Sequence, residues 1–417
     1  MRIWVAAYLA ALVTLLGLAL AGGAVLYDNR GPSDAIEAAA SGHEYSLTSW
    51  ELRHFPGKWL YKMGGFLSGR SPGDPDADLR RYFELTERIG AQEQASASGG
   101  GAQDLTAERA QLENRAEDII EGRITRLLED QGLALRPPLF SDLGLVFPPV
   151  DFEFDSPPRV LAVSPRDRIH LDASFLLSPG LDLQTVTSIE QEAEAARLPR
   201  RYPHGVSALV VNTGGVATYP SVVSDLASYQ SLIDTVIHEW LHQYLAFFPL
   251  GSSYFKDSET RTLNESVANL GGQALAGLYF QRYGTLSPIP TPAPVSPSPA
   301  GAQTGGRQPG FDFGQEMRAL RVRVEELLNG GKTAEAEALM EQKRQEFAQH
   351  GVFIRRLNQA YFAFHGSYAD TPASIDPIGP KLETLLQRAG SPGAFVRLAA
   401  GLSSAAELDA LLAKLGL

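Results

Sequence analysis

Two histidines four residues apart, His238 and His242, constrain this chain more than any other feature, because the stretch around them has the apolar spacing of a helix. Residues four apart lie on one face of an α-helix, so both imidazoles can point at the same ligand. We therefore predict a helix over residues 228–248, which Pro249 ends. Its apolar positions are Leu232, Ile233, Val236, Ile237, Trp240, Leu241 and Leu245.

The residue after His238 adds a chemical function to this helix. The string His238-Glu239-Trp240-Leu241-His242 has the H-E-x-x-H pattern, in which the two imidazoles bind zinc. Glu239 lies beside such an ion rather than on it, where its carboxylate can act as a general base toward water that the ion activates. The structural alternative is a helix that carries the string by chance. We predict a Zn²⁺ site with Glu239 as a catalytic residue.

A catalytic zinc usually takes three protein ligands and leaves one position for water. The chain contains no cysteine, so the third ligand must be His, Glu or Asp. Glu265 is the best candidate, because it opens a helix predicted over residues 263–283 after a short loop. Asn269 would follow one turn later on the same face, placed to orient a ligand imidazole. Glu259 is the second candidate, and the structural alternative for Glu265 is a carboxylate favoured by a helix N-terminus.

These motifs resemble those of the gluzincin peptidases, the thermolysin-like group, in which H-E-x-x-H is followed on the next helix by N-E-x-x-x-D. The resemblance covers residues 238–242 and 264–269, with an extended stretch at 217–223 ahead of the first helix. It implies a zincin-like fold and zinc-dependent hydrolysis of a peptide or protein substrate, which an edge strand at 217–223 would align. Asn269 departs from the pattern, since the family usually has Asp there. The tail at residues 358–368 is more loosely similar to bacterial membrane-associated aminopeptidases.

The same resemblance implies a residue that stabilises the oxyanion. In gluzincins, a Tyr or His from the downstream helical region serves this purpose. Tyr361, His365 and Tyr368 occur here at helical spacings, and we predict His365 and Tyr368 as catalytic residues. The structural alternative is a partly buried helix with aromatic packing.

The distribution of helical and extended patterns indicates an α+β fold. Between residues 137 and 286, short β-type runs at 159–163, 170–177, 206–211 and 217–223 alternate with helical stretches, one of them at 183–196. We expect a zincin-like catalytic domain, with a small mixed sheet and the active-site helices, followed by a mainly helical C-terminal region. The expected parts are a transmembrane anchor at 1–27, a juxtamembrane segment and flexible linker at 28–103, the catalytic domain at 104–286, a Pro-rich linker or insert at 287–310, and the helical C-terminal region at 311–417.

The N-terminus predicts a membrane location. Residues 3–27 contain no charged side chain and are long enough to span a hydrocarbon core. Arg2 precedes them, which favours a cytoplasmic N-terminus. We expect one N-terminal transmembrane helix in the cell membrane, with the catalytic domain extracytoplasmic. A signal peptide with a cleavage site at Ala19-Leu20-Ala21 is the alternative, but the apolar run continues past that site.

Charge narrows the choice of partners. The formal net charge is −12 and no basic run occurs, which argues against nucleic acid, because phosphate binding needs clustered Lys and Arg. The sequence thus predicts a zinc metallopeptidase. The alternatives are a catalytically inactive metalloprotease-like binding or assembly protein anchored in the membrane, and a structural protein in which the H-E-x-x-H string is accidental.

Overall fold

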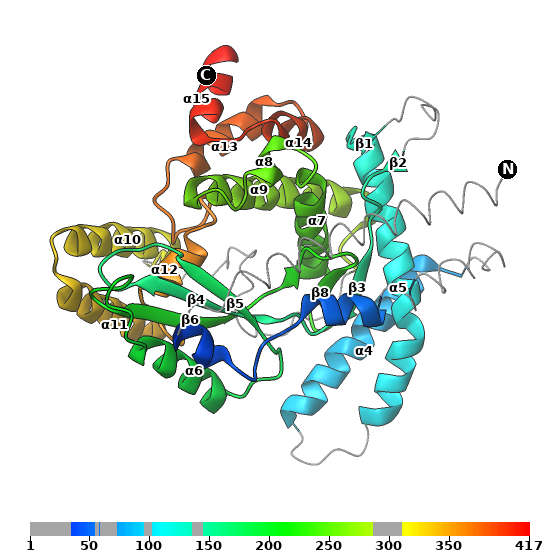
Figure 1. Cartoon of the computed structure of the whole chain (residues 1–417). Helices are drawn as coiled ribbons and strands as arrows, with labels where there is room; N and C mark the ends of the chain where they lie inside the picture. The colour runs from blue at the N-terminus through cyan, green and yellow to red at the C-terminus, as the bar shows by residue number, and fades with distance from the viewer. Residues whose placement is uncertain (1–34, 55–57, 59–72, 96–101, 136–144, 287–310) are drawn as a thin grey trace.

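Helices dominate the part of the chain that the structure describes, and the strands in that part form three small sheets (Figure 1). The structure is a computed structural model that describes residues 35–54, 58, 73–95, 102–135, 145–286 and 311–417. Of these residues, 60% are helical. The helices are α2 (Ala35–Ala40), α4 (Pro75–Ala95), α5 (Ala102–Asp130), α6 (Leu183–Ala195), α7 (Tyr229–Leu245), α8 (Pro249–Ser252), α9 (Ser258–Tyr283), α10 (Phe313–Asn329), α11 (Thr333–Gln349), α12 (Gln359–His365), α13 (Ile378–Arg388), α14 (Pro392–Ala400) and α15 (Ala405–Lys414).

The sheets differ in the direction of their strands. In the first, β4 lies between β5 and β6 and is antiparallel to both. In the second, β8 pairs in parallel with β3 and antiparallel with β7, which forms one edge. A short antiparallel pair, β1 and β2, makes the third. The strands are β1 (Ala134–Leu135), β2 (Leu145–Val146), β3 (Phe152–Asp155), β4 (Arg159–Pro165), β5 (Ala173–Leu177), β6 (Val206–Asn212), β7 (Gly215–Val216) and β8 (Ser221–Ser224).

The expected edge strand at residues 217–223 is therefore divided. Residues 217–220 lie outside the strands, β8 lies inside the sheet, and β3 and β7 form its two edges. Pro220 contributes to this break, because proline has no backbone N–H to donate to a strand partner.

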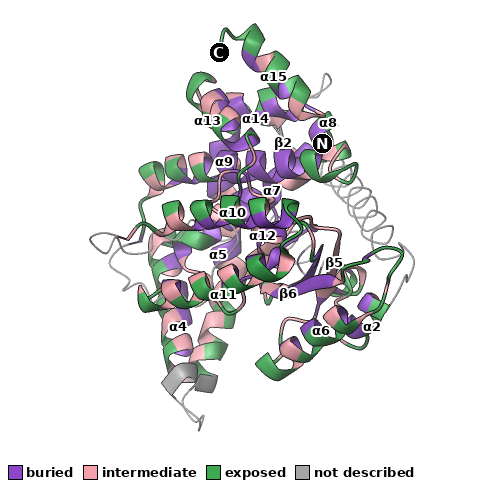
Figure 2. Ribbon diagram, turned by 90° about the vertical axis from the view of Figure 1, so that its left-hand side faces the viewer, coloured by how far each residue is buried: buried purple, intermediate pink, exposed green. Residues whose placement is uncertain are grey.

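Helices α7 and α9 pack against each other at the centre of the molecule. Figure 2 shows both as largely buried, whereas α4, α6 and α11 present exposed faces to solvent. The core around them also takes Leu79 and Tyr82 from α4 and Leu382 and Phe395 from α13 and α14. The largest core thus joins helices from the expected segments 28–103, 104–286 and 311–417.

Helix α9 begins at Ser258, five residues before the predicted start at residue 263. The Asp257 side chain accepts a hydrogen bond from the backbone N–H of Thr260, and the Thr260 hydroxyl pairs with the Asp257 backbone, which forms a capping box. Glu265 therefore lies beyond the first turn of α9. The helix dipole stabilises carboxylates only within the first turn, so it does not explain the glutamate at position 265.

The C-terminal region contains a second, smaller core formed by α10, α11 and α12. Helix α12 starts at Gln359, after Asn358 accepts a hydrogen bond from the backbone N–H of Tyr361. A turn at residues 366–370 follows α12 and leads toward α13.

The prediction of a single-pass membrane protein needs correction. No helix within the described ranges is both long and apolar enough to cross a membrane. The longest of them, α5, carries acidic and basic side chains along its whole length. Residues 1–27, from which the transmembrane helix was expected, lie outside the described residues. We therefore do not retain the N-terminal transmembrane helix as part of the fold class, nor the cell-membrane, extracytoplasmic localisation derived from it.

Candidate metal centre

The three predicted metal ligands come together between α7 and α9. The Nε2 atoms of His238 and His242 lie 3.8 and 3.4 Å from Oε2 of Glu265. The two Nε2 atoms lie 3.0 Å apart. In the described part of the chain, this is the one group of three His, Asp or Glu side chains whose ligand atoms all lie within 4.8 Å of one another. Glu259, the second candidate, is exposed and instead accepts a hydrogen bond from the backbone N–H of Ala405.

The polar atoms of this group fit a bound cation. Oε2 of Glu265 is buried without a hydrogen-bond donor, which is costly for a carboxylate oxygen. The two imidazole nitrogens face each other at 3.0 Å, where two lone pairs repel unless a proton or a metal ion lies between them. Two imidazoles and one carboxylate are the donor set of many catalytic zinc sites. A divalent cation between the three side chains would satisfy all of these atoms.

The ionisation of the three ligands supports the same assignment. Burial raises the pKa of Glu265, but the imidazoles of His242 and His238 outweigh it and lower that pKa to about 2. Burial and the neighbouring His242 lower the pKa of His238 to about 3. Burial opposes a charge on His242 as well, but Glu265 raises the pKa of that ring to about 9. At neutral pH these directions pair a protonated His242 with an ionised Glu265, and a metal ion can replace the proton on His242.

Two polar side chains hold the ligands in place. Oδ1 of Asn264 lies 2.8 Å from Nδ1 of His242. The Tyr254 hydroxyl donates a hydrogen bond of 2.5 Å to Oε1 of Glu265. Sequence reasoning missed both residues, although the position of Asn264 directly before Glu265 in the N-E motif was a signal for it. The orienting role was predicted for Asn269, which donates to Asp370 at 2.6 Å.

Glu239 lies on α7 next to this group and is buried. Burial raises its pKa to about 7, with a further contribution from Glu265 and an opposing one from His242. A carboxylate with a pKa near neutrality can both accept and return a proton. The edge strand β7 passes close by, since a Cβ atom placed on Gly215 would lie 3.0 Å from Oε1 of Glu239.

The two predicted oxyanion residues lie in different surroundings. The ring of Tyr368 is 6.2 Å from the ring of His238, centroid to centroid. Burial, together with the charges of Glu265 and Glu239, raises the pKa of Tyr368 well above its ordinary value. His365 packs instead against Tyr361, at 4.3 Å between ring centroids, and burial lowers its pKa to about 4. The structure thus brings Tyr368 close to the candidate metal ligands, whereas His365 lies in aromatic packing.

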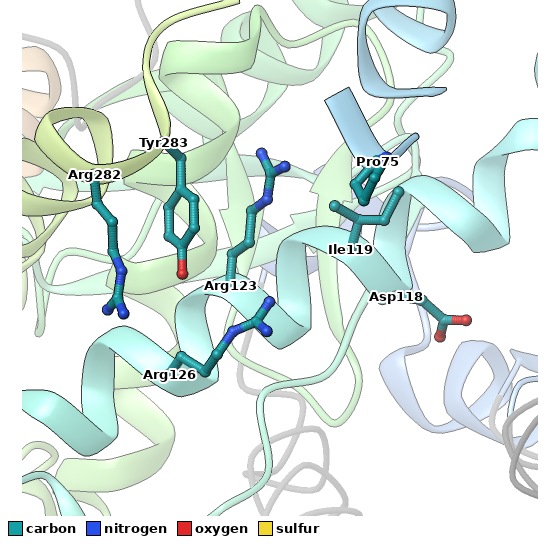
Figure 3. Close-up of a pocket in the computed structure, with 7 residues that line it drawn as sticks. All are labelled: Pro75, Asp118, Ile119, Arg123, Arg126, Arg282 and Tyr283. Atoms are coloured by element: carbon teal, nitrogen blue, oxygen red, sulfur yellow. The ribbon is translucent and has the colours of Figure 1, made fainter. Parts of the chain in front are cut away.

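A cavity of about 380 Å³ lies elsewhere, between α5 and the end of α9 (Figure 3). None of the residues discussed above lines it. Two of its guanidinium groups have carboxylate partners, because Arg123 pairs with Asp76 at 2.6 Å and Arg282 with Asp130 at 2.5 Å. These ion pairs connect α5 with α4 and with the end of α9. The lining residues are Pro75, Asp118, Ile119, Arg123, Arg126, Arg282 and Tyr283.

No family model, curated protein or solved structure matches this chain. The candidate site combines three side chains suited to a divalent cation, a buried carboxylate beside them and a tyrosine from the turn after α12. This combination is suited to hydrolysis by activated water.

Proposed function

We propose that this protein is a zinc-dependent peptidase that hydrolyses peptide bonds. The observation that carries the proposal is the convergence of His238, His242 and Glu265 on one point, with Glu239 beside them on the same helix as the histidines. His238, His242 and Glu265 would hold the ion. When bound, zinc would polarise a substrate carbonyl and make water more acidic.

The protein's own side chains supply the proton transfers. Glu239 takes a proton from the attacking water and later passes it to the leaving amine. Its raised pKa, near 7, suits both steps. The phenol of Tyr368 donates a hydrogen bond to the carbonyl oxygen as negative charge develops there. Asn264 and Tyr254 keep the ligand side chains in place during the reaction.

The edge strand β7 offers a place for the substrate backbone. Its neighbour in the sheet is β8 on one side only. An extended peptide can therefore add to the sheet along β7 through main-chain hydrogen bonds. Because Gly215 has no side chain, a peptide backbone on this strand can lie close to Glu239.

A digest of a mixed peptide library tests the proposal. We expect cleavage with zinc present and none after treatment with a chelator, and the fragments would show whether the protein cuts at chain ends or internally. Glu239→Gln should keep zinc but lose turnover, whereas His242→Ala should lose both. Glu259→Gln, which makes the same chemical change at an exposed position of α9, serves as the control and should cleave like the parent.

Two outcomes would contradict the proposal. If Glu239→Gln cleaves as fast as the parent, Glu239 is not the general base. If the parent protein holds zinc but cleaves no peptide in the library, the result favours the alternative, a metalloprotease-like binding or assembly protein without turnover.

A further inference from the structure

The turn that carries Tyr368 is bound to the same helix that provides the Glu265 ligand. The backbone N–H of Ala369 donates a 2.8 Å hydrogen bond to Oγ of Ser266, the residue directly after Glu265. One turn further along α9, the side-chain amide of Asn269 donates a 2.6 Å hydrogen bond to Oδ2 of Asp370. Tyr368 thus immediately precedes two residues that are anchored on α9.

The bond between Asn269 and Asp370 is polar and well shielded. Asn269 is 3% exposed, and burial raises the pKa of Asp370. Hydrogen bonds to a carboxylate are about twice as strong as those between neutral groups. A carboxylate in place of the Asn269 amide would face the Asp370 carboxylate across the same short distance. The contact with Asp370 therefore explains why position 269 carries an amide, whereas the N-E-x-x-x-D motif has an aspartate at this position.

Other contacts fix the course of the turn. The Thr371 hydroxyl lies 2.9 Å from the carbonyl oxygens of both Tyr368 and His365. Helix α13 also approaches the turn, so closely that a Cβ atom on Gly379 would lie 2.3 Å from the carbonyl oxygen of Ala369. Both α9 and α13 therefore hold the turn, with the Tyr368 ring 6.2 Å from the ring of His238.

We propose that Asn269 and Asp370 form a positioning pair that sets the Tyr368 phenol against the metal centre. The inference rests on the proposed function and deepens it, because it identifies the contacts that place Tyr368 beside the metal ligands. Neither member of the pair touches the reacting atoms. Both act through Tyr368, whose hydrogen bond to the developing oxyanion works only at a fixed distance.

Exchanging the two side chains tests the pair. Asn269→Asp places two carboxylates face to face, and we expect kcat to fall by about tenfold or more, toward the loss expected for Tyr368→Phe. The double variant Asn269→Asp/Asp370→Asn restores one amide and one carboxylate. It should recover kcat to within about threefold of the parent. KM and zinc content should stay at the parent values in all of these variants.

A matched control separates positioning from general stability. Gln273→Glu makes the same amide-to-carboxylate change one turn later on α9, at an exposed position, and should leave kcat unchanged. If Asn269→Asp leaves kcat unchanged, or if the double variant is no better than the single one, the pair does not position Tyr368. A loss of zinc or of thermal stability that parallels the loss of kcat would assign the pair to folding and overturn the proposal.

The affinity of a zinc-ligating phosphinic dipeptide gives a readout that does not depend on turnover. Its tetrahedral phosphinate resembles the charged state that Tyr368 would stabilise. Asn269→Asp should weaken its binding about tenfold and the double variant should restore it. If the parent binds this probe but cleaves no peptide, the proposed function fails while the pair is still tested. Equal affinity in the parent and in Asn269→Asp would overturn the pair.

Discussion

Asn264 faces His242 between α9 and α7, with its amide oxygen 2.8 Å from Nδ1 of the ring. An amide oxygen only accepts hydrogen bonds, so this distance requires a proton on Nδ1. Nε2 faces Glu265 and His238, and its lone pair becomes available to a metal ion once the proton on that nitrogen is displaced. Residues 264 and 265 of α9 therefore provide both the group that selects the tautomer of His242 and the carboxylate of the metal centre.

Removing this acceptor should weaken the metal site. In Asn264→Ala, His242 can rotate or bind its proton on the other nitrogen, and we expect zinc affinity to fall by about 10- to 100-fold. Asn264→Asp keeps an acceptor in the same place and should retain zinc. Competition with a chromophoric chelator measures both. Unchanged affinity in Asn264→Ala would show that Asn264 does not orient the ring.

Tyr254 should act on the carboxylate ligand in a similar way. Its hydroxyl donates to Oε1 of Glu265, which leaves Oε2 facing the two imidazoles. In Tyr254→Phe the carboxylate loses this restraint, and we expect zinc affinity to fall by about tenfold. Tyr283→Phe removes a hydroxyl at the distant cavity between α5 and α9 and serves as the control. Equal losses in the two variants would contradict a specific role for Tyr254.

The sequence predicts that the His238 and His242 side chains lie together because their relation is local. Four-residue spacing on a helix places His238 and His242 together whatever the rest of the fold does. The predicted helix at 228–248 corresponds to α7, Tyr229–Leu245. The start of α9 was missed because the capping box at Asp257 and Thr260 precedes the apolar pattern.

Contacts between distant parts of the chain could not be predicted in this way. Asn269 and Asp370 are 101 residues apart, and no periodicity relates them. Strand β3 has an alternating pattern, with Phe152 and Phe154 buried, but four residues are too few for periodicity to identify. Its partner β8 follows more than sixty residues later. The roles of Asn264, Tyr254 and Asn269 depend on where such segments meet.

The edge strand β7 gives a prediction about the general base. A Cβ atom on Gly215 would lie 2.7 Å from Cγ2 of Thr235, 2.9 Å from the carbonyl oxygen of Val222 and 3.0 Å from Oε1 of Glu239. Gly215→Ala should therefore displace Glu239 or the strand, and lower kcat by about tenfold or more with zinc retained. Gly277→Ala is the control, since a Cβ atom there meets no atom within 4 Å. Full activity in Gly215→Ala would show that β7 does not confine Glu239.

The pH dependence of stability can be tested at Asp234, which lies one turn before His238 on α7. Burial raises the pKa of this carboxyl group from 3.8 to about 6. The folded protein therefore holds a proton that the unfolded chain has already lost between these pH values. The stability that this group contributes is fully present below pH 3.8 and is lost as the pH rises through 6.

An asparagine at this position cannot ionise, so Asp234→Asn should stabilise the folded protein only where Asp234 is charged. We expect a gain of about 1 to 3 kcal/mol above pH 7, since one pKa unit corresponds to about 1.4 kcal/mol. At pH 4 the variant and the parent should be nearly equal. Urea unfolding at the two pH values measures the difference. Asp409→Asn removes an exposed charge on α15 together with its ion pair to Lys381, and should lower stability by less than about 1 kcal/mol, equally at both pH values. A gain at pH 4 as large as that above pH 7 would mean that Asp234 does not titrate as its burial requires.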